Sequence, residues 1–362
     1  MPRAEGHAGE APTGRPRTGV SQCTQTWGHG APWHPAPHLN VTLPALAPRL
    51  SPTLPLPLPL PLVLLALRLM GRRQRFTSHE ALRAAVAADR RQTQVEPPAA
   101  LARRFQVSQR LIGAHRCLTL TPHTVRHPAQ LTYVHGGGHV AQISPYHWRM
   151  LAHLADHVGC TVHVPLYPLA PEHAHPSAFA MLDALYDEQI HRHGAEHCVW
   201  MGDSSGGGLA MVIAQRALAR GLPAVRDLVL ISPWLDLALS DPELPALAAV
   251  DPWLDLPGMA AAAQWWADGH DPAAPHLSPI NGRLEGLQRL SVFMGTRDLL
   301  WPASRRLLAR AQTAGVAMTL HEAQDMIHVW PLLPIAQARP ALATMAQLIA
   351  MPAEPVMPVM PT

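Results

Sequence analysis

The 362-residue chain is long enough for one large α/β domain with additions, and its 48% hydrophobic content is ample for a buried core. A formal net charge of +3 on so long a chain excludes the basic surface typical of nucleic-acid-binding proteins. Arginine supplies all 28 basic residues, and the absence of lysine excludes Walker-type phosphate binding, pyridoxal Schiff bases and Ser-Lys hydrolases.

The 4 cysteines and 23 histidines do not follow the spacings typical of metal sites. The cysteines form no CxxC pair, which favours free, buried thiols and a cytoplasmic location. The histidines form no HExxH motif, and we expect the pairs His173/His175 and His191/His193 to lie on the surface. We therefore predict no metal site.

Residues 1–60 are predicted to form a proline-rich, disordered extension, because most of them lack a sustained hydrophobic period. Residues 54–62 alternate leucine with proline, which excludes a helix there. The apolar run over 62–70 is too short to span a bilayer, and basic residues follow it, unlike the order in a signal peptide. We expect a short helix that docks on the domain, without stable membrane insertion, and the alternative is a membrane-surface role.

An amphipathic helix is predicted before the main domain. Thr77 and Glu80 have the spacing of a capping box, and Leu82 and Val86 begin an apolar helical face that extends to about residue 92. The Pro97-Pro98 pair then breaks the chain between this helix and the first predicted strand.

Residues 105–351 alternate between strand and helix patterns. Strands are expected at 105–110, 116–121, 130–134, 160–165, 198–201, 227–232, 291–295 and 316–321. Helices are expected at 145–157, 177–192, 204–219, 302–313 and 335–350. This alternation predicts an α/β fold with a mostly parallel sheet and helices on both faces.

One segment interrupts that alternation. Residues 234–285 contain several prolines and then a helix that carries Trp265 and Trp266. We expect this insertion to cover the active site, with these tryptophans and Trp253 adding bulk over it. The alternative is that the tryptophans only pack the cap onto the domain, which is the commoner role of large aromatic side chains. The tail over 352–362 is again proline-rich and is expected to be loose.

A glycine-rich turn follows the predicted strand 198–201. Residues 202–206, GDSSG, fit the nucleophile-elbow pattern G-x-S-x-G, in which a serine lies on a sharp turn between a strand and a helix. The helix-forming run 209–219 provides the second half of that context. Trypsin-like proteases have a similar sequence around their serine, but they are all-β, whereas strands alternate with helices in this chain. The pattern therefore indicates Ser204 as the nucleophile of an α/β enzyme.

The partners of such a serine are predicted from the ends of later strands. A serine hydroxyl becomes an effective nucleophile when a histidine takes its proton and a carboxylate orients that histidine. Asp298 follows the strand 291–295 and His328 follows the strand 316–321, so both belong to the carboxyl edge of the sheet. The chain order Ser204, Asp298, His328 is that of α/β-hydrolases.

Other residues near His328 are weaker candidates for the acid and the base. Glu322 and Asp325 share a loop with His328 and would have to fold back toward its ring. His321 lies at the end of a strand, where a structural role is favoured.

A second glycine-rich turn, residues 135–138 or HGGG, follows the strand 130–134. Successive glycines let the main chain approach the oxygen of a tetrahedral intermediate. The predicted oxyanion-hole donors are the N–H groups of Gly137 and Gly138, together with that of Ser205. His135 is expected to brace this loop and not to transfer a proton.

These motifs resemble the hormone-sensitive-lipase-like family of α/β-hydrolases, esterases marked by HGGG and GDSAGG. Residues 167–173 resemble the family's YRLAPEH segment, and residues 232–236 resemble its SPWLD segment. The resemblance covers about residues 75–350. It implies the α/β-hydrolase fold and a helical cap made of 61–104 and the insertion 234–285.

Two residues depart from the family pattern. His139 stands where the family usually has Phe or Tyr, and we expect this change to alter the acyl pocket. Ser205 replaces the usual Ala, and we expect no effect because the donor is its backbone N–H.

The resemblance implies a serine carboxylic-ester hydrolase that needs no cofactor. We expect short-chain or compact esters to be cleaved through an acyl-enzyme, and lactone hydrolysis and acyl transfer remain open. The alternative from another class is a small-molecule receptor that lost turnover, but such receptors usually lack the base, and His328 is present. The expected partner is a small-molecule ester or lactone, without nucleic acid, and a homodimer remains open.

Overall fold

The computed structural model describes residues 24–27, 56–92 and 95–352. These residues form a nine-stranded sheet in the order β1-β9-β8-β7-β6-β4-β5-β3-β2. The strands are β1 (Thr24–Trp27), β2 (Phe105–Ile112), β3 (His115–Pro122), β4 (Gln130–Val134), β5 (Thr161–Pro165), β6 (Cys198–Asp203), β7 (Asp227–Ile231), β8 (Arg289–Gly295) and β9 (Ala317–Ala323).

Most of the sheet is parallel. β4 pairs in parallel with β5 and β6, and the parallel ladder continues through β7 and β8 to β9. At the other edge, β3 pairs antiparallel with β5, and β2 pairs antiparallel with β3. Every residue of β6 and β7 is buried, as expected for parallel strands covered on both faces. The predicted mostly parallel sheet is therefore confirmed.

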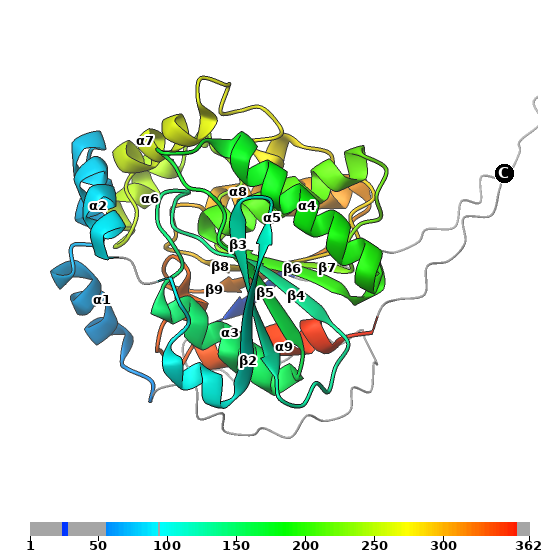
Figure 1. Cartoon of the computed structure of the whole chain (residues 1–362). Coiled ribbons are helices and arrows are strands. Elements are labelled where there is room, and N and C mark those ends of the chain that lie inside the picture. The colour runs from blue at the N-terminus through cyan, green and yellow to red at the C-terminus, as the bar shows by residue number, and fades with distance from the viewer. Residues whose placement is uncertain (1–23, 28–55, 93–94, 353–362) are drawn as a thin grey trace, which may run out of the picture.

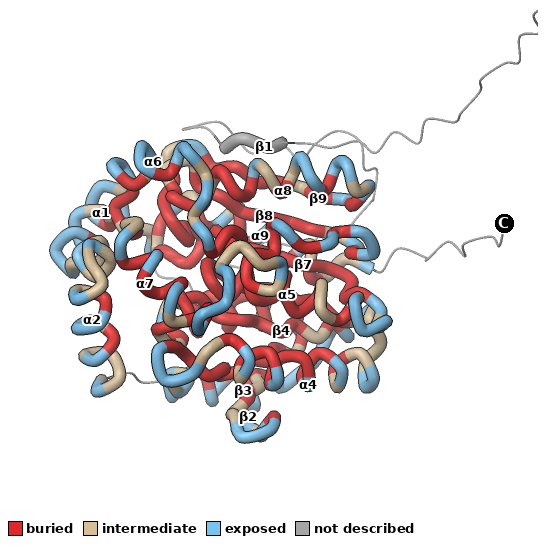
Figure 2. Tube along the Cα trace, turned by 90° about the horizontal axis from the view of Figure 1, so that it is seen from above, coloured by how far each residue is buried: buried red, intermediate tan, exposed pale blue. Residues whose placement is uncertain are grey.

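Helices lie on both faces of this sheet. They are α1 (Leu60–Leu69), α2 (His79–Gln92), α3 (Pro145–Val158), α4 (His175–His193), α5 (Ser204–Ala219), α6 (Leu244–Val250), α7 (Leu256–Ala267), α8 (Trp301–Ala314) and α9 (Ala338–Ala350). α3 and α9 cover one face, whereas α4, α5 and α8 cover the other (Figure 1). Each face has its own apolar core, and the exposed parts of the chain lie around the rim (Figure 2).

Two segments far apart in the chain meet beyond the end of the sheet. α2 packs against α7 of the insertion, and both lie beside the short helix η1 (Arg73–Phe76) (Figure 1). Gly258 lies against the backbone of Phe76, where a Cβ would clash. The buried faces of Leu82 and Val86 hold α2 in this position.

The prediction that residues 54–62 exclude a helix is wrong at the end of that range. α1 begins at Leu60 with Pro61 in its first turn, where the missing N–H of proline would have no helical partner in any case. Val63 and Leu67 are buried against the domain. No helix within the described residues is long and apolar enough to cross a membrane.

The cap of α2 also differs from the prediction. The Ser78 hydroxyl accepts the backbone N–H of Ala81 at 3.1 Å, so Ser78 takes the capping position. The Thr77 hydroxyl instead donates to the carbonyl oxygen of Gln74 at 2.9 Å, because Thr77 ends η1. The local spacing could not reveal this preceding turn.

β1 corrects part of the predicted disorder of residues 1–60. It pairs in parallel with β9, whose outer edge would otherwise leave N–H and C=O groups without ladder partners. Its residues include Thr and Trp, which have high strand propensity, but four residues are too few for a visible period. The rest of 1–55, and the predicted tail from residue 353, lie outside the described residues.

A buried ion network joins β7 and β8 to α9. Asp227 accepts from the Nε of Arg226 at 2.6 Å and from the Nε of Arg289 at 2.7 Å. The side chain of Asp227 is 2% exposed and that of Arg226 is 5% exposed. Arg226 also donates to the carbonyl oxygen of Ile349 at 2.7 Å, which ties α9 to the sheet.

We expect Asp227→Ala to lower the free energy of unfolding by about 3–5 kcal/mol, because it leaves the buried Arg226 guanidinium without its anion. The matched variant Asp187→Ala removes an exposed carboxylate that pairs with Arg220, and should cost about 0–1 kcal/mol. Urea denaturation measures both values. Equal costs would contradict the assigned role of the network.

Candidate active site

The turn between β6 and α5 holds Ser204 in an unusual backbone conformation. Its φ of 51° is left-handed and strained for a residue with a side chain. Gly206 lies so close to the carbonyl oxygens of Val134 and His135 that a Cβ would clash with both. The glycine therefore lets the serine turn approach the end of β4.

The structure brings Ser204, His328 and Asp298 together from the ends of β6, β9 and β8. Oγ of Ser204 lies 3.0 Å from Nε2 of His328, and Nδ1 of His328 lies 3.0 Å from Oδ2 of Asp298. Asp298 is fully buried, and its Oδ1 accepts the backbone N–H of Leu300 at 2.9 Å. An ionised carboxylate only accepts, so Nδ1 of His328 carries the proton and Nε2 can accept from the serine.

Burial lowers the pKa of His328, but the carboxylates of Asp298, Asp251 and Asp203 together outweigh burial and raise the pKa above the ordinary histidine value. The imidazolium form is thus favoured by these carboxylates. This electrostatic arrangement suits a histidine that receives a proton from Ser204.

Asp251 is a second carboxylate here that sequence reasoning missed. One of its oxygens accepts the N–H groups of Trp253 and Leu254 at 2.7 and 3.0 Å, and the other accepts that of Leu299 at 2.8 Å. Burial and the neighbouring Asp298 raise the pKa of Asp251 to about 6. Asp251 belongs to the insertion, and no motif or spacing marked it.

The alternative acids and base have other partners. The His321 ring stacks on Phe293 with centroids 4.3 Å apart, and burial lowers its pKa to about 4. Glu322 accepts from the indole N–H of Trp301. The Asp325 carboxylate accepts from the side-chain amide of Gln324 at 3.3 Å, in the loop that leads to His328. The geometry therefore favours Asp298 and His328.

The glycine loop lines the cavity around Ser204. Gly137 and Gly138 have φ values of 124° and 63°, which glycine adopts without strain. Their N–H groups have no acceptor in the described part of the chain. The N–H of Ser205 belongs to the first turn of α5, where helical N–H groups lack partners within the helix. The three predicted donors are therefore available to a ligand.

Asp203 anchors this loop, a role that the motif did not reveal. Its Oδ1 accepts the Gly136 N–H at 2.7 Å and the Tyr133 hydroxyl at 2.6 Å, and its Oδ2 lies 3.2 Å from Nε2 of His147. Burial raises the pKa of Asp203, but His147 and the donated hydrogen bonds outweigh burial and leave the pKa below its usual value. Asp203 is therefore a buried, fully partnered anion next to Ser204.

The tautomer of His147 follows from its neighbours. The backbone N–H of Ser144 donates to Nδ1 of His147 at 3.0 Å, so Nδ1 accepts and Nε2 carries the proton that faces Asp203. Ser144 is the N-cap of α3, and His147 completes its capping box. The start of α3 is thereby tied to the glycine loop.

His135 is buried in the wall of the site. Its ring stacks on Tyr167 with centroids 4.5 Å apart, and the Tyr167 hydroxyl donates to the His135 carbonyl oxygen at 2.8 Å. Nδ1 of His135 lies 2.9 Å from the carbonyl oxygen of Gly136. Burial lowers its pKa to about 4, so the ring is neutral at physiological pH. These contacts brace the first turn of the loop.

His139 does not itself line the cavity, and its effect on the acyl pocket stays a prediction. Its backbone φ is 62°, and its ring stacks on Trp266 with centroids 4.0 Å apart and planes 6° apart. The same ring also lies against Trp234, which does line the cavity, with centroids 5.9 Å apart. Trp266 was expected to lie over the cavity, but it packs on His139 and does not line the cavity. Trp265 does not line the cavity either, and its ring contacts that of His79 in α2 with centroids 5.2 Å apart. Large aromatic side chains here pack the insertion onto the domain.

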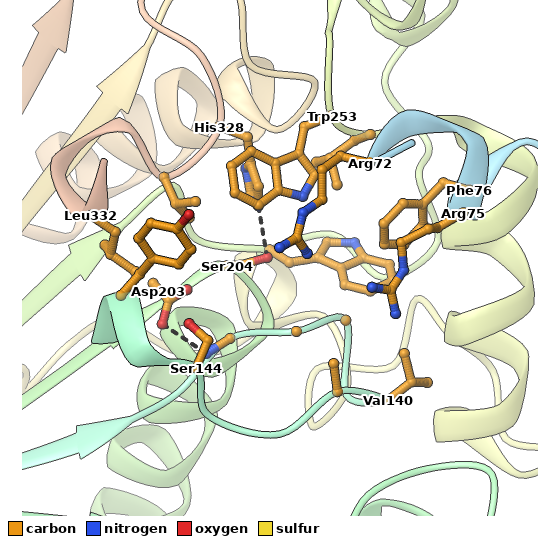
Figure 3. Close-up of a pocket in the computed structure, with 18 of the residues that line it drawn as sticks. Arg72, Arg75, Phe76, Val140, Ser144, Asp203, Ser204, Trp253, His328 and Leu332 are labelled. Carbon is orange, nitrogen blue, oxygen red and sulfur yellow. Dashed lines mark hydrogen bonds between the residues drawn. The ribbon is translucent and has the colours of Figure 1, made fainter. Parts of the chain in front are cut away.

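Trp253 does line the cavity, as expected. Its ring meets His328 edge-on with centroids 6.0 Å apart (Figure 3). The apolar part of the lining comes from the N-terminal segment, the glycine loop, the insertion and the segment that follows His328: Phe76, Leu82, Val140, Trp234, Leu254, Met259, Leu332 and Leu333. The cavity is thus closed by segments that are distant in the chain.

No group of His, Cys, Asp and Glu side chains in the described residues is arranged to hold a metal ion. The buried cysteines Cys117, Cys160 and Cys198 are free thiols.

Comparison with known proteins gives consistent matches. A model of the alpha/beta hydrolase fold matches residues 131–332. A triacylglycerol lipase of Mycobacterium tuberculosis is 31% identical over 213 residues, covering 58% of this chain but only 44% of the lipase. An acetyl-hydrolase of Streptomyces hygroscopicus is 32% identical over 209 residues, covering 56% of this chain and 70% of that protein.

Solved structures match over a longer range. The crystal structure of an esterase from the bacterial hormone-sensitive lipase family superposes with a TM-score of 0.70 at 26% identity. The match covers 84% of this chain and 99% of that esterase. It therefore includes helices outside the matched family model.

We expect His139→Phe to make the protein more resistant to acid. Burial lowers the pKa of His139 to about 3, so below about pH 6.5 the unfolded chain takes up a proton that the folded chain excludes. Stability is therefore lost as pH falls from 6.5 toward 3, and phenylalanine removes this term while keeping the stack on Trp266.

The stability gain of His139→Phe should grow by about 2 kcal/mol between pH 7 and pH 5. Urea denaturation at both pH values measures it. His191→Phe, at an exposed position of α4, is the matched control and should show no comparable change. A gain independent of pH would contradict the neutral, buried state of His139.

Proposed function

This chain belongs to the hormone-sensitive-lipase-like family of α/β-hydrolases, a family of ester-hydrolysing enzymes, and we propose that it cleaves carboxylic esters through an acyl-enzyme on Ser204. The observation that carries the proposal is the chain of contacts from Ser204 through His328 to Asp298, at 3.0 Å each. These contacts open onto a cavity with largely apolar walls. The proposal extends to the whole protein, although the chain spans less than half of the lipase that it matches.

In the acylation step, Oγ of Ser204 attacks the ester carbonyl carbon while Nε2 of His328 takes the hydroxyl proton. The Asp298 carboxylate stabilises the resulting imidazolium through its bond to Nδ1. The N–H groups of Gly137, Gly138 and Ser205 would receive the oxyanion of the tetrahedral intermediate. Collapse of this intermediate breaks the bond to the alcohol, which leaves with the proton from His328.

Deacylation repeats the sequence with water. His328 takes a proton from a water molecule, whose oxygen attacks the acyl carbon on Ser204. The second intermediate then releases the carboxylic acid and returns the proton to Oγ. No step requires a cofactor, since the nucleophile, base and oxyanion donors all come from the chain.

We also propose that short-chain or compact esters are the substrates and that the enzyme acts in the cytoplasm. The cavity lies under a cap formed by the N-terminal helices and the insertion, which supports a limited substrate size. The free, buried Cys117, Cys160 and Cys198 support a reducing compartment.

Ser204→Ala and His328→Ala should each lower kcat for p-nitrophenyl butyrate by a factor of about 10⁴ or more, with the fold retained, because the two groups act as one unit. The double variant should lose little more than either single variant. Steady-state kinetics and circular dichroism on purified proteins test this. Near-normal turnover by folded Ser204→Ala would refute the assignment.

Turnover should rise and then fall along the p-nitrophenyl series from acetate to palmitate, with its maximum among the short chains. Each buried methylene contributes about 0.8 kcal/mol until the cavity is full. Met259→Ala, which removes a buried lining side chain, should shift the maximum to longer chains. The decisive measurement is kcat/KM for each ester. A maximum at palmitate, or activation at an oil–water interface, would instead indicate a lipase with a mobile lid.

A further inference from the structure

The segment between α1 and α2 carries arginines that differ in their pairing. Arg73 pairs with the carboxylate of Asp255 at 2.9 Å, and Arg75 pairs with that of Asp89. Arg72 lines the cavity, and its guanidinium has no hydrogen bond or ion pair within the described ranges, whereas its backbone N–H donates to the carbonyl oxygen of Leu67 at 3.1 Å. Its guanidinium therefore presents unused N–H donors to the cavity.

Arg72 lies close to the reacting centre. Its side chain points into the cavity that contains Ser204 (Figure 3). The central carbon of its guanidinium lies 5.6 Å from the centroid of the Trp253 ring, and that ring meets His328 at 6.0 Å. Trp253 thus contacts both the guanidinium and the ring of the proposed base.

The surroundings of Arg72 favour an anion. Burial lowers its pKa, although an arginine side chain stays protonated in proteins. Phe76 and Leu82 on the same wall exclude water and so strengthen attraction between opposite charges. The carboxylate whose charge acts on Arg72 is that of Asp89, and it is already paired with Arg75.

The contact with Trp253 explains only part of this arrangement. The guanidinium carbon of Arg72 lies 5.6 Å from the Trp253 ring centroid, and a cation over an aromatic ring gains about 0.5–1 kcal/mol when it is solvent-accessible. The N–H donors of a guanidinium lie in its plane, and their parallel pairs match the geometry of a carboxylate. The cation–π contact forms no hydrogen bond, so these N–H donors can still bind an anion.

We propose that Arg72 forms an anion subsite and that the preferred substrates are monoesters of dicarboxylic acids. Their free carboxylate would stay on Arg72 during both half-reactions, because the acyl part remains on the enzyme after the alcohol leaves. Water is added across the ester bond and the products are the alcohol and the dicarboxylate, with Arg72 taking no part in bond making. The inference rests on the proposed function of Ser204.

The test uses monomethyl succinate, glutarate and adipate, each paired with the methyl ester whose free carboxylate is replaced by a carboxamide. The pH-stat measures kcat/KM for both members of each pair, and the readout is the ratio of charged to neutral ester. Because the ratio is taken within one protein, any loss of folded enzyme cancels.

We expect the wild-type enzyme to prefer the charged member of at least one pair, and Arg72→Gln to lower that ratio about ten-fold or more. Arg72→Lys keeps the positive charge but lacks the planar pairs of N–H donors, so its ratio should lie between those of the wild-type enzyme and Arg72→Gln. Arg68→Gln, a matched change at an exposed position of α1 outside this cavity, should leave the ratio unaltered.

Two results would overturn the subsite. One is a wild-type preference for the neutral member of every pair, and the other is a ratio that Arg72→Gln does not change. Failure of the proposed function looks different, because the neutral esters would then not be hydrolysed or would be hydrolysed equally by Ser204→Ala.

Discussion

The buried carboxylate of Asp203 is the interaction on which the geometry of the site depends. It accepts the N–H of Gly136 and the hydroxyl of Tyr133, and it faces His147 at the start of α3. An unpartnered charge at this depth would be strongly destabilising, so these donors are held in place relative to the carboxylate. Since Ser204 is the next residue in the chain, the glycine loop and the serine turn are positioned as one unit.

The cavity above this unit depends on a different constraint, the meeting of two distant segments. α2 and η1 reach α7 because Gly258 leaves room for the backbone of Phe76. The packing of these two segments brings Arg72 and Trp253 together next to His328. No pattern in either local sequence predicts this contact. The cavity walls thus depend on how the cap packs, whereas the proposed bond making is assigned to groups at the carboxyl edge of the sheet.

The sequence by itself determined the parallel sheet and the places where Ser204, Asp298 and His328 leave it. Strands buried on both faces show continuous apolar runs, and the glycines of the two turns mark positions where the backbone must be strained or closely approached. Such features can be predicted from the sequence because backbone conformation and the spacing of buried residues depend on only a few neighbouring residues. Chain order then indicated which strand ends meet, since parallel strands share one carboxyl edge.

Tertiary structure alone decided where the side chains point. His139 and Trp266 belong to segments that looked like parts of a pocket, yet they stack on each other behind it. Asp251 lies beside Asp298 only because the insertion folds back, and β1 exists only because β9 has an open edge. Packing and edge pairing depend on what arrives from elsewhere in the chain, so no period, spacing or motif of these segments could determine them.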